Sequence, residues 1–151
     1  MSSVHVKIEI DAPIERVWET VIDPERLGEW VTIHRAISNV SAEPLREGGT
    51  MDQSMCIRGV TFKVHWRAAR VNGPNLVVWE GHGPAHSIAS IRYDLSENGN
   101  GGTVFDYYND FTPPGGRLGS MASRFVVGAA SEREARKSLE RLKTLVESER
   151  D

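Results

Sequence analysis

Several features that mark specialised classes of protein are scarce in this sequence. One cysteine, Cys56, stands among 151 residues, which excludes a disulfide within the chain and a zinc site built from cysteine thiolates. No segment approaches the ~18 consecutive apolar residues of a membrane-spanning helix. Residues 1–10 lack the basic start and apolar run of a secretory signal. We therefore expect a cytoplasmic protein without a membrane span, in which Cys56 is a small buried apolar side chain.

An excess of positive charge is also missing. The 18 Lys and Arg residues are scattered among 21 Asp and Glu residues, which gives a formal net charge of −3. Because nucleic acids bind to strongly basic surfaces, we expect no nucleic-acid partner. The hydrophobic fraction of 39% and the charged fraction of 26% are typical of an ordinary folded domain. The length predicts a single domain over residues 1–151.

Signatures of covalent catalysis and of nucleotide cofactors are not found either. The sequence has no Gly-x-Ser-x-Gly motif, and Cys56 has no neighbours that would activate a thiol. Gly115, Gly116 and Gly119 precede a helical segment, but they lack the spacing of a dinucleotide fingerprint and do not follow a parallel strand. We therefore predict no cofactor.

The N-terminal segment predicts one strand followed by two short helices. Apolar and polar residues alternate over residues 4–10, which is the pattern of a strand with one buried face. Pro13 suits the first turn of a helix, and a single apolar stripe follows it. The stripe consists of Ile14, Val17, Trp18, Val21 and Ile22. Asp23-Pro24 ends this helix and begins a second one, which Gly28 closes, and we expect Trp18 to pack inward.

The rest of the chain predicts an antiparallel meander and a long helix. Strand patterns cover residues 50–58, 61–71, 76–81, 86–95 and 103–111, and short turns rich in Gly, Pro and Asn separate them. Residues 112–119 are rich in Pro and Gly, and we hypothesise that they form a gate. Residues 120–149 predict one helix, whose stripe a glycine and a glutamate interrupt. This stripe is Met121, Phe125, Gly128, Glu132, Ala135, Leu139, Leu142 and Val146.

This order of elements predicts an α+β domain in which a curved antiparallel sheet of about seven strands wraps the long C-terminal helix. The segment VKIEIDAPIERVWETVIDPERLGEW resembles the opening of the polyketide cyclase/dehydrase and lipid-transport group of the START-like, Bet v 1-like helix-grip superfamily. The segment SEREARKSLERLKTLVES is similar to the terminal helix of that group. The resemblance implies a helix-grip fold with an interior cavity between the sheet and the C-terminal helix.

Aromatic and apolar residues at predicted inward positions make up the candidate ligand site. Ligand pockets are typically apolar concavities of about 300 to 1,000 Å³ with a few polar groups that orient the ligand. The candidate ligand-binding residues are Trp30, Phe62, Val64, Trp66, Trp79, Tyr93, Phe105, Tyr107, Phe125 and Ala129. The alternative is that these side chains fill the core and leave no cavity.

Four polar residues are candidates for acid and base chemistry: His82, His86, Tyr107 and Glu132. Glu132 interrupts the helix stripe, so it either faces the cavity or, if Ala129 takes the inward place, is solvated. The two histidines flank a Gly-Pro turn, where they either share a metal, donate a proton at the cavity rim or lie in solvent. A third metal ligand is not evident, so we predict no metal site.

Three functions stay open at this point. The first is the binding of a small hydrophobic molecule such as a lipid, a polyketide or an isoprenoid. The second, implied by the resemblance, is a polyketide cyclase or aromatase that assists aldol closure and dehydration in the same cavity. The third is a protein-interaction module of the antitoxin-like type. We favour binding, because the predicted inward strand positions are mainly apolar and the histidines lie near turns. We make no prediction of the oligomeric state.

Overall fold

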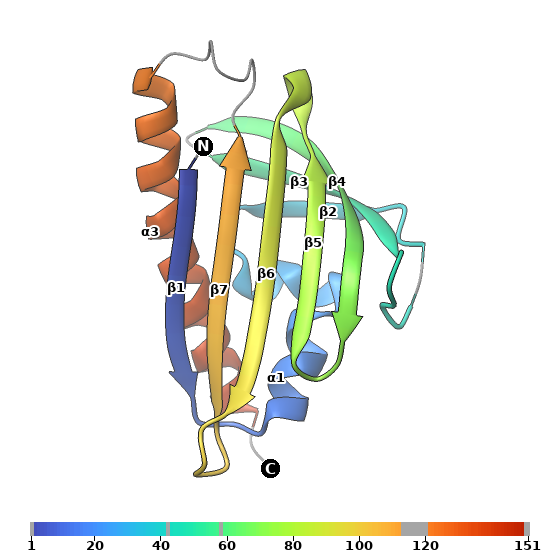
Figure 1. Ribbon diagram of the computed structural model, residues 1–151, viewed down its shortest axis with the longest axis vertical. Coiled ribbons are helices and arrows are strands. Elements are labelled where there is room, and N and C mark those ends of the chain that lie inside the picture. The colour runs from blue at the N-terminus through green and yellow to red at the C-terminus, as the bar shows by residue number, and fades with distance from the viewer. Residues whose placement is uncertain (1, 42, 58, 113–120, 150–151) are drawn as a thin grey trace.

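A curved sheet of seven antiparallel strands forms the frame of this protein (Figure 1). The structure, a computed structural model, describes residues 2–41, 43–57, 59–112 and 121–149, and for residues 2 and 121–131 it describes the backbone alone. The strands are β1 (Ser2–Ile10), β2 (His34–Ser38), β3 (Thr50–Ile57), β4 (Val60–Asn72), β5 (Leu76–His82), β6 (Ile88–Glu97) and β7 (Thr103–Thr112). They lie in the order β1-β7-β6-β5-β4-β3-β2. Strands β2 to β7 therefore form a meander, and β1 pairs with β7.

The helices lie on one side of this sheet and at one end of it (Figure 1). They are α1 (Ile14–Val21), α2 (Leu27–Trp30) and α3 (Met121–Ser148), and two 3-10 turns, η1 (Pro24–Arg26) and η2 (Pro84–His86), accompany them. The long helix α3 runs beside β1, and the sheet curves around it. The predicted α+β helix-grip fold is thereby confirmed. Within the described parts of the chain, no helix is both long and apolar enough to cross a bilayer.

The strand pattern differs from the prediction in two places. The sequence does not predict β2 as a separate strand, because its side chains are only half-buried or exposed, as suits a strand at the edge of a sheet. The strand predicted from residue 86 begins at Ile88 instead, because residues 84–86 form the turn η2. In that turn Ala85 and His86 adopt positive φ angles of 53° and 64°, which a strand does not allow.

The short helices close one end of the sheet. Val17 and Val21 of α1 are almost fully buried, and Trp18 is 9% exposed, which confirms that the predicted stripe faces inward. The indole of Trp18 packs against the turn between β4 and β5, where Gly73 leaves room for it. A Cβ atom on Gly73 would lie 2.8 Å from the indole ring, so no larger residue fits there without a shift.

The last helix lies against the sheet through the C-terminal part of its predicted stripe. Ala135, Leu139, Leu142 and Val146 are all buried, because residues spaced by three and four positions share one face of a helix. Polar contacts hold the helix at both sides of this face. Lys143 Nζ donates to the carbonyl oxygen of Glu9 in β1 at 3.0 Å. The backbone N–H of Thr32, which follows α2, donates to Ser138 Oγ at 3.0 Å.

Candidate ligand cavity between the sheet and the last helix

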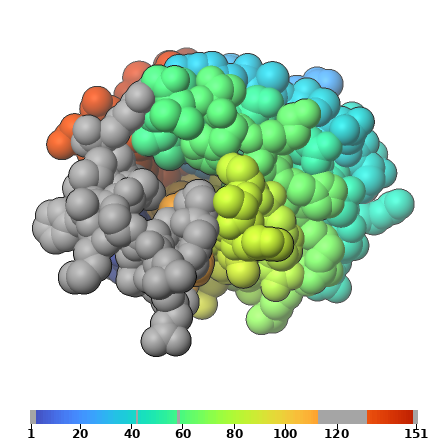
Figure 2. All heavy atoms as spheres, turned by 90° about the horizontal axis from the view of Figure 1, so that it is seen from above, coloured from blue at the N-terminus to red at the C-terminus, as the bar shows by residue number. Residues whose placement is uncertain are grey.

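A cavity of about 130 Å³ lies between the sheet and α3. Its wall comes from α1, α2, inward positions of β3 to β7 and the middle of α3. Figure 2 looks down on the end of the molecule with the β3–β4 turn and the β5–β6 connection, and it shows recessed atoms between these segments. Ile57, Phe62, Ala89 and Phe111 belong to the wall and lie near the strand ends on this side.

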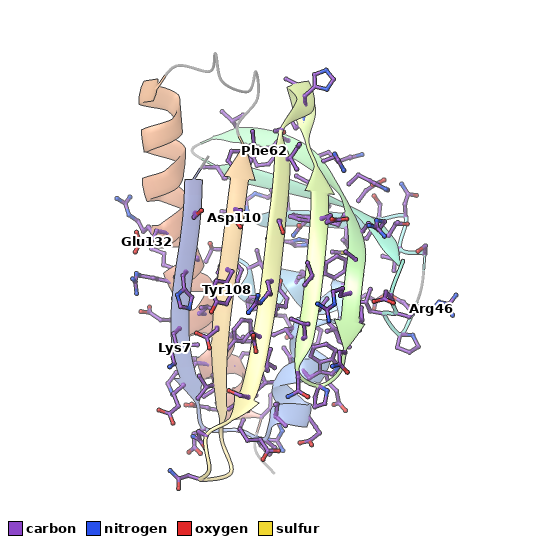
Figure 3. The ribbon with its side chains drawn as sticks, viewed as in Figure 1. Lys7, Arg46, Phe62, Tyr108, Asp110 and Glu132 are labelled. Carbon is purple, nitrogen blue, oxygen red and sulfur yellow. The ribbon has the colours of Figure 1, made fainter. Side chains whose placement is uncertain are left out.

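Most of the predicted ligand-binding residues lie on the cavity wall. The wall includes Trp30, Phe62, Val64, Trp66, Trp79, Tyr93 and Tyr107. Three of the rings form a ladder, since Trp30 packs against Tyr93 with ring centroids 5.9 Å apart and Tyr93 against Tyr107 at 6.0 Å. Phe62 lies at the upper end of β4 (Figure 3). The predicted aromatic set thus surrounds a space instead of filling it completely.

Phe105 is the exception among the described residues of that set. It is fully buried, but it is not part of the cavity wall. Its ring packs against Tyr93 with centroids 5.4 Å apart, so it supports the wall and does not form it. The side chains of the other two candidates, Phe125 and Ala129, lie outside the described residues, and so does most of the segment 112–119 for which we hypothesised a gate.

The structure places three of the four acid–base candidates away from the cavity, which is the solvated alternative for Glu132 and for the two histidines. Glu132 is exposed and accepts a hydrogen bond from Arg136 Nη2 at 3.0 Å. Figure 3 shows it on the side of α3 that faces away from the sheet. His82 is exposed because side chains alternate along β5 and the inward position beside it belongs to Gly81. His86 is exposed in η2, and of the four only Tyr107 lies on the cavity wall.

The metal alternative for the two histidines finds no support in the described part of the chain. No group of three or more His, Cys, Asp or Glu side chains there is arranged to hold a metal ion. His82 ends β5, and His86 closes the turn that follows it. Two imidazoles alone do not complete the coordination sphere of a tetrahedral zinc site.

Sequence reasoning missed several polar residues of the wall, namely Gln53, Asn109, Glu134 and Ser138. A signal for the first two was present, because each stands between apolar residues of a strand at a spacing of two, as Gln53 does between Met51 and Met55. The same alternation turns Cys56 to the opposite face of β3. There it is half-buried, so our expectation of a buried cysteine was wrong.

Gln53 joins the cavity wall to His34 through two hydrogen bonds. The indole N–H of Trp66 donates to Gln53 Oε1 at 2.9 Å, and Gln53 Nε2 donates to His34 Nδ1 at 2.8 Å. Because Nδ1 accepts this bond, the ring of His34 must be neutral at that nitrogen. Burial, assisted by the nearby charge of Arg35, lowers the pKa of His34 below its ordinary value. The hydrogen bonds and the pKa direction therefore agree on a neutral His34.

Acidification is expected to destabilise the fold through His34. Its folded-state pKa lies below the unfolded value of 6.5, so the unfolded chain takes up the proton first as the pH falls. The stabilising contribution is complete above about pH 6.5 and is lost progressively as the pH drops toward the folded-state pKa. Thermal unfolding between about pH 7 and pH 5, compared with His34→Phe, measures this contribution. An equal pH dependence of both proteins over this range would refute it.

Two buried polar atoms of the wall have no hydrogen-bond partner among the described residues. They are the indole nitrogen of Trp30 and the Oδ1 atom of Asn109. The amide nitrogen of Asn109 is engaged, because it donates to the hydroxyl oxygen of Tyr107 at 3.1 Å.

Burial raises the pKa of Tyr107 to about 12 and also raises the pKa of Tyr93. Both phenols therefore stay protonated near neutral pH and are poor bases.

Comparison with known proteins gives the same fold. A family model described as polyketide cyclase / dehydrase and lipid transport matches residues 1–147. The toxin Rv0910 of Mycobacterium tuberculosis is 23% identical over 146 residues, which are 96% of this chain and 98% of that protein. The crystal structure of TTHA0849 from Thermus thermophilus is 16% identical with a TM-score of 0.78, and the match covers 99% of both chains. DynU16, of the dynemicin biosynthetic locus, is 18% identical with a TM-score of 0.66, covering 97% of this chain and 48% of its own.

Proposed function

We propose, since this chain belongs to the polyketide cyclase / dehydrase and lipid transport family, that it binds a small hydrophobic molecule in the cavity between its sheet and α3. The observation that carries the proposal is the cavity itself, about 130 Å³ lined mainly by apolar and aromatic side chains. Removing apolar surface from water contributes about 25 cal/mol per Å². A few polar groups on an otherwise apolar wall are the usual means of orienting such a ligand.

The size of the cavity limits the ligand that fits without rearrangement. Apolar cavities of about 150 Å³ in protein cores take up benzene, and the cavity of this protein, at about 130 Å³, is slightly smaller. A single ring or a short acyl chain therefore fits the wall as it stands. A larger molecule requires side chains of the wall to move outward, and Phe62, a half-buried wall residue near the start of β4, is the first candidate.

A cyclase is less well supported than a binding protein. Acid–base catalysis needs groups that change protonation near neutral pH within reach of one ligand position. Among the described residues of the wall, the ionisable side chains are Tyr93, Tyr107 and Glu134. Burial raises the pKa of both tyrosines, which makes them hydrogen-bond donors and poor bases. The described part of the wall thus offers one carboxylate and no histidine or lysine to pair with it.

A protein-interaction module has weaker support still. Such a module requires a contiguous exposed apolar patch. Over the described residues, the large apolar side chains that are exposed are Val60 and Ile88, on different strands. A few exposed apolar side chains are normal on the surface of a folded protein.

Native mass spectrometry of protein purified without detergent tests the binding proposal. We expect a bound apolar molecule that extraction with organic solvent releases and identifies. Adding toluene, which is small enough for the cavity, should raise the melting temperature of the extracted protein, because a ligand of the folded state alone stabilises it. A ligand-free mass together with an unchanged melting temperature in toluene would contradict the proposal. Turnover of an added poly-β-ketone would instead favour a cyclase.

A further inference from the structure

We propose that the molecule in this cavity carries a neutral hydroxyl group, as in an alcohol or a phenol, and that Tyr107 and Asn109 bind this group together. The inference rests on the proposed binding function, because it names the chemistry of the ligand in the same cavity. It makes Tyr107 and Asn109 the residues that determine ligand specificity, whereas the rest of the wall supplies apolar contact.

The two residues form one polar unit on the wall. They occupy alternate positions of β7, so their side chains point to the same face of the sheet. Asn109 Nδ2 donates to the hydroxyl oxygen of Tyr107 at 3.1 Å. In this orientation of the amide, Oδ1 is the free end of the Asn109 side chain.

This unit presents one donor and one acceptor that the described residues leave unused. The hydroxyl of Tyr107 accepts the bond from Asn109, and its own proton remains available. Asn109 Oδ1 is buried without a partner among the described residues. A hydroxyl group is the smallest group that satisfies both, because its oxygen accepts from Tyr107 while its proton is donated to Asn109. Buried polar groups are nearly always hydrogen-bonded in native proteins, so a bound molecule or a water is expected here.

Two other polar side chains of the wall, Gln53 and Ser138, are already engaged in hydrogen bonds. Gln53 accepts from Trp66 and donates to His34. Ser138 Oγ accepts the backbone N–H of Thr32. The indole nitrogen of Trp30, the other fully buried atom without a partner among the described residues, is separated from Tyr107 by Tyr93 along the ladder of rings. The Tyr107–Asn109 pair thus offers an available hydroxyl proton and a fully buried, unpaired acceptor side by side.

The charge of the wall favours a neutral ligand. Among its described residues there is no Lys, Arg or His, and Glu134 is the one acidic side chain. An anionic ligand such as a carboxylate would be buried without a counter-charge, which is strongly unfavourable. Tyr107 itself stays neutral, because burial raises its pKa to about 12. These features of the described wall disfavour an ionised carboxylate at this position and favour an uncharged group such as a hydroxyl.

Toluene and phenol separate the hydroxyl anchor from the cavity, since both have one ring and similar shapes. Calorimetric titration of the extracted protein is expected to give phenol about tenfold tighter binding than toluene, which corresponds to about 1.4 kcal/mol. In Asn109→Leu, which is of similar size and removes both polar atoms, the preference should invert, with toluene now the tighter ligand. Tyr107→Phe should lose the preference as well. Asn100→Leu makes the same change at an exposed position of the β6–β7 turn and should bind like the unchanged protein.

Each outcome bears on one of the two proposals. A preference for phenol that disappears in both cavity variants and persists in Asn100→Leu supports the anchor. Equal binding of toluene and phenol to the unchanged protein overturns the anchor while leaving the cavity in place, and indicates that water satisfies Asn109. A preference that survives Asn109→Leu and Tyr107→Phe also overturns it. Failure of both probes to bind the unchanged protein overturns the proposed binding function itself.

Discussion

Ala89→Phe is expected to abolish ligand binding while the protein still folds. Ala89 lies on β6 and belongs to the cavity wall. The added phenyl ring is the size of benzene, the guest that a cavity of about 150 Å³ accepts, so it fills the 130 Å³ available. In the unchanged protein, toluene at 100 times its Kd should stabilise the fold by about 2.7 kcal/mol. In the variant this stabilisation should fall to nearly zero, as measured by thermal unfolding with and without toluene.

A matched control makes the same change outside the cavity. Ala36 on β2 is exposed, and Ala36→Phe adds the same ring without entering the wall. This variant should keep both the copurified molecule and the response to toluene. The overpacking in Ala89→Phe is expected to destabilise the fold by about 1 to 3 kcal/mol, which leaves a folded protein for the assay. Toluene binding of unchanged strength in Ala89→Phe would show that the ligand lies elsewhere.

Trp66→Ala is expected to cause the largest loss of stability among single changes at the cavity. The side chain of Trp66 is 3% exposed, and its ring packs edge-on against Trp79 at 6.5 Å between centroids. Truncating a buried tryptophan costs about 3 to 5 kcal/mol, and stranding the Oε1 atom of Gln53 adds about 1 to 3 kcal/mol. Domains are commonly stable by about 5 to 15 kcal/mol. Urea unfolding should therefore show a large decrease in the midpoint, or no folded baseline.

Trp66→Phe separates the ring from its N–H group. It keeps an aromatic ring beside Trp79 but leaves Gln53 without its donor, so a loss of about 1 to 3 kcal/mol is expected from the missing hydrogen bond, with a smaller addition from the lost volume. The free energies of unfolding of Trp66→Ala, Trp66→Phe and the unchanged protein separate the loss due to the ring from the loss due to the hydrogen bond. A loss below about 1 kcal/mol in Trp66→Ala would mean that the indole is not a packed element of the wall.

The packing around Trp66 explains why β5 carries a glycine at its inward position. The ring of Trp66 lies over Gly81, and a Cβ atom there would be 2.5 Å from the ring. Trp66 of β4 and Gly81 of β5 lie directly opposite each other in the pairing of these strands. The sequence marks Gly81 only as one of several glycines around a turn. Its role depends on the strand register, which brings a large ring onto this position.

Much of the candidate wall was predictable from the alternation of side chains along the strands. A period of two assigns Val64 and Trp66 to the inner face of β4 and Tyr93 and Tyr107 to the inner faces of β6 and β7. This period does not tell which inward side chains contact a cavity and which fill the core. Phe105 has the same inward pattern, but the packing of Tyr93 against it removes it from the wall.

The polar part of the wall depends on contacts between distant residues. Gln53 and His34 are separated by 19 positions and become neighbours through the pairing of β2 with β3. Packing likewise decides which face of α3 points toward the sheet. Ala135 and Leu139 take the inward places on the sheet, and Glu132 reaches solvent, where it pairs with Arg136. The apolar stripe in the sequence does not fix the rotation of the helix about its axis closely enough to tell whether Glu132 points inward or outward.

The sequence by itself determined the class and order of the elements, since the spacing of apolar residues specifies which face of each strand and helix is buried. It thereby determined the meander, the two short helices at the Asp23-Pro24 corner and the amphipathic helix that the sheet wraps. Only the tertiary structure decided that a cavity of about 130 Å³ remains and that Asn109 Oδ1 lacks a partner among the described residues. The physical reason is that burial of a face is a local preference, whereas empty space and unpaired atoms result from how side chains of several elements meet.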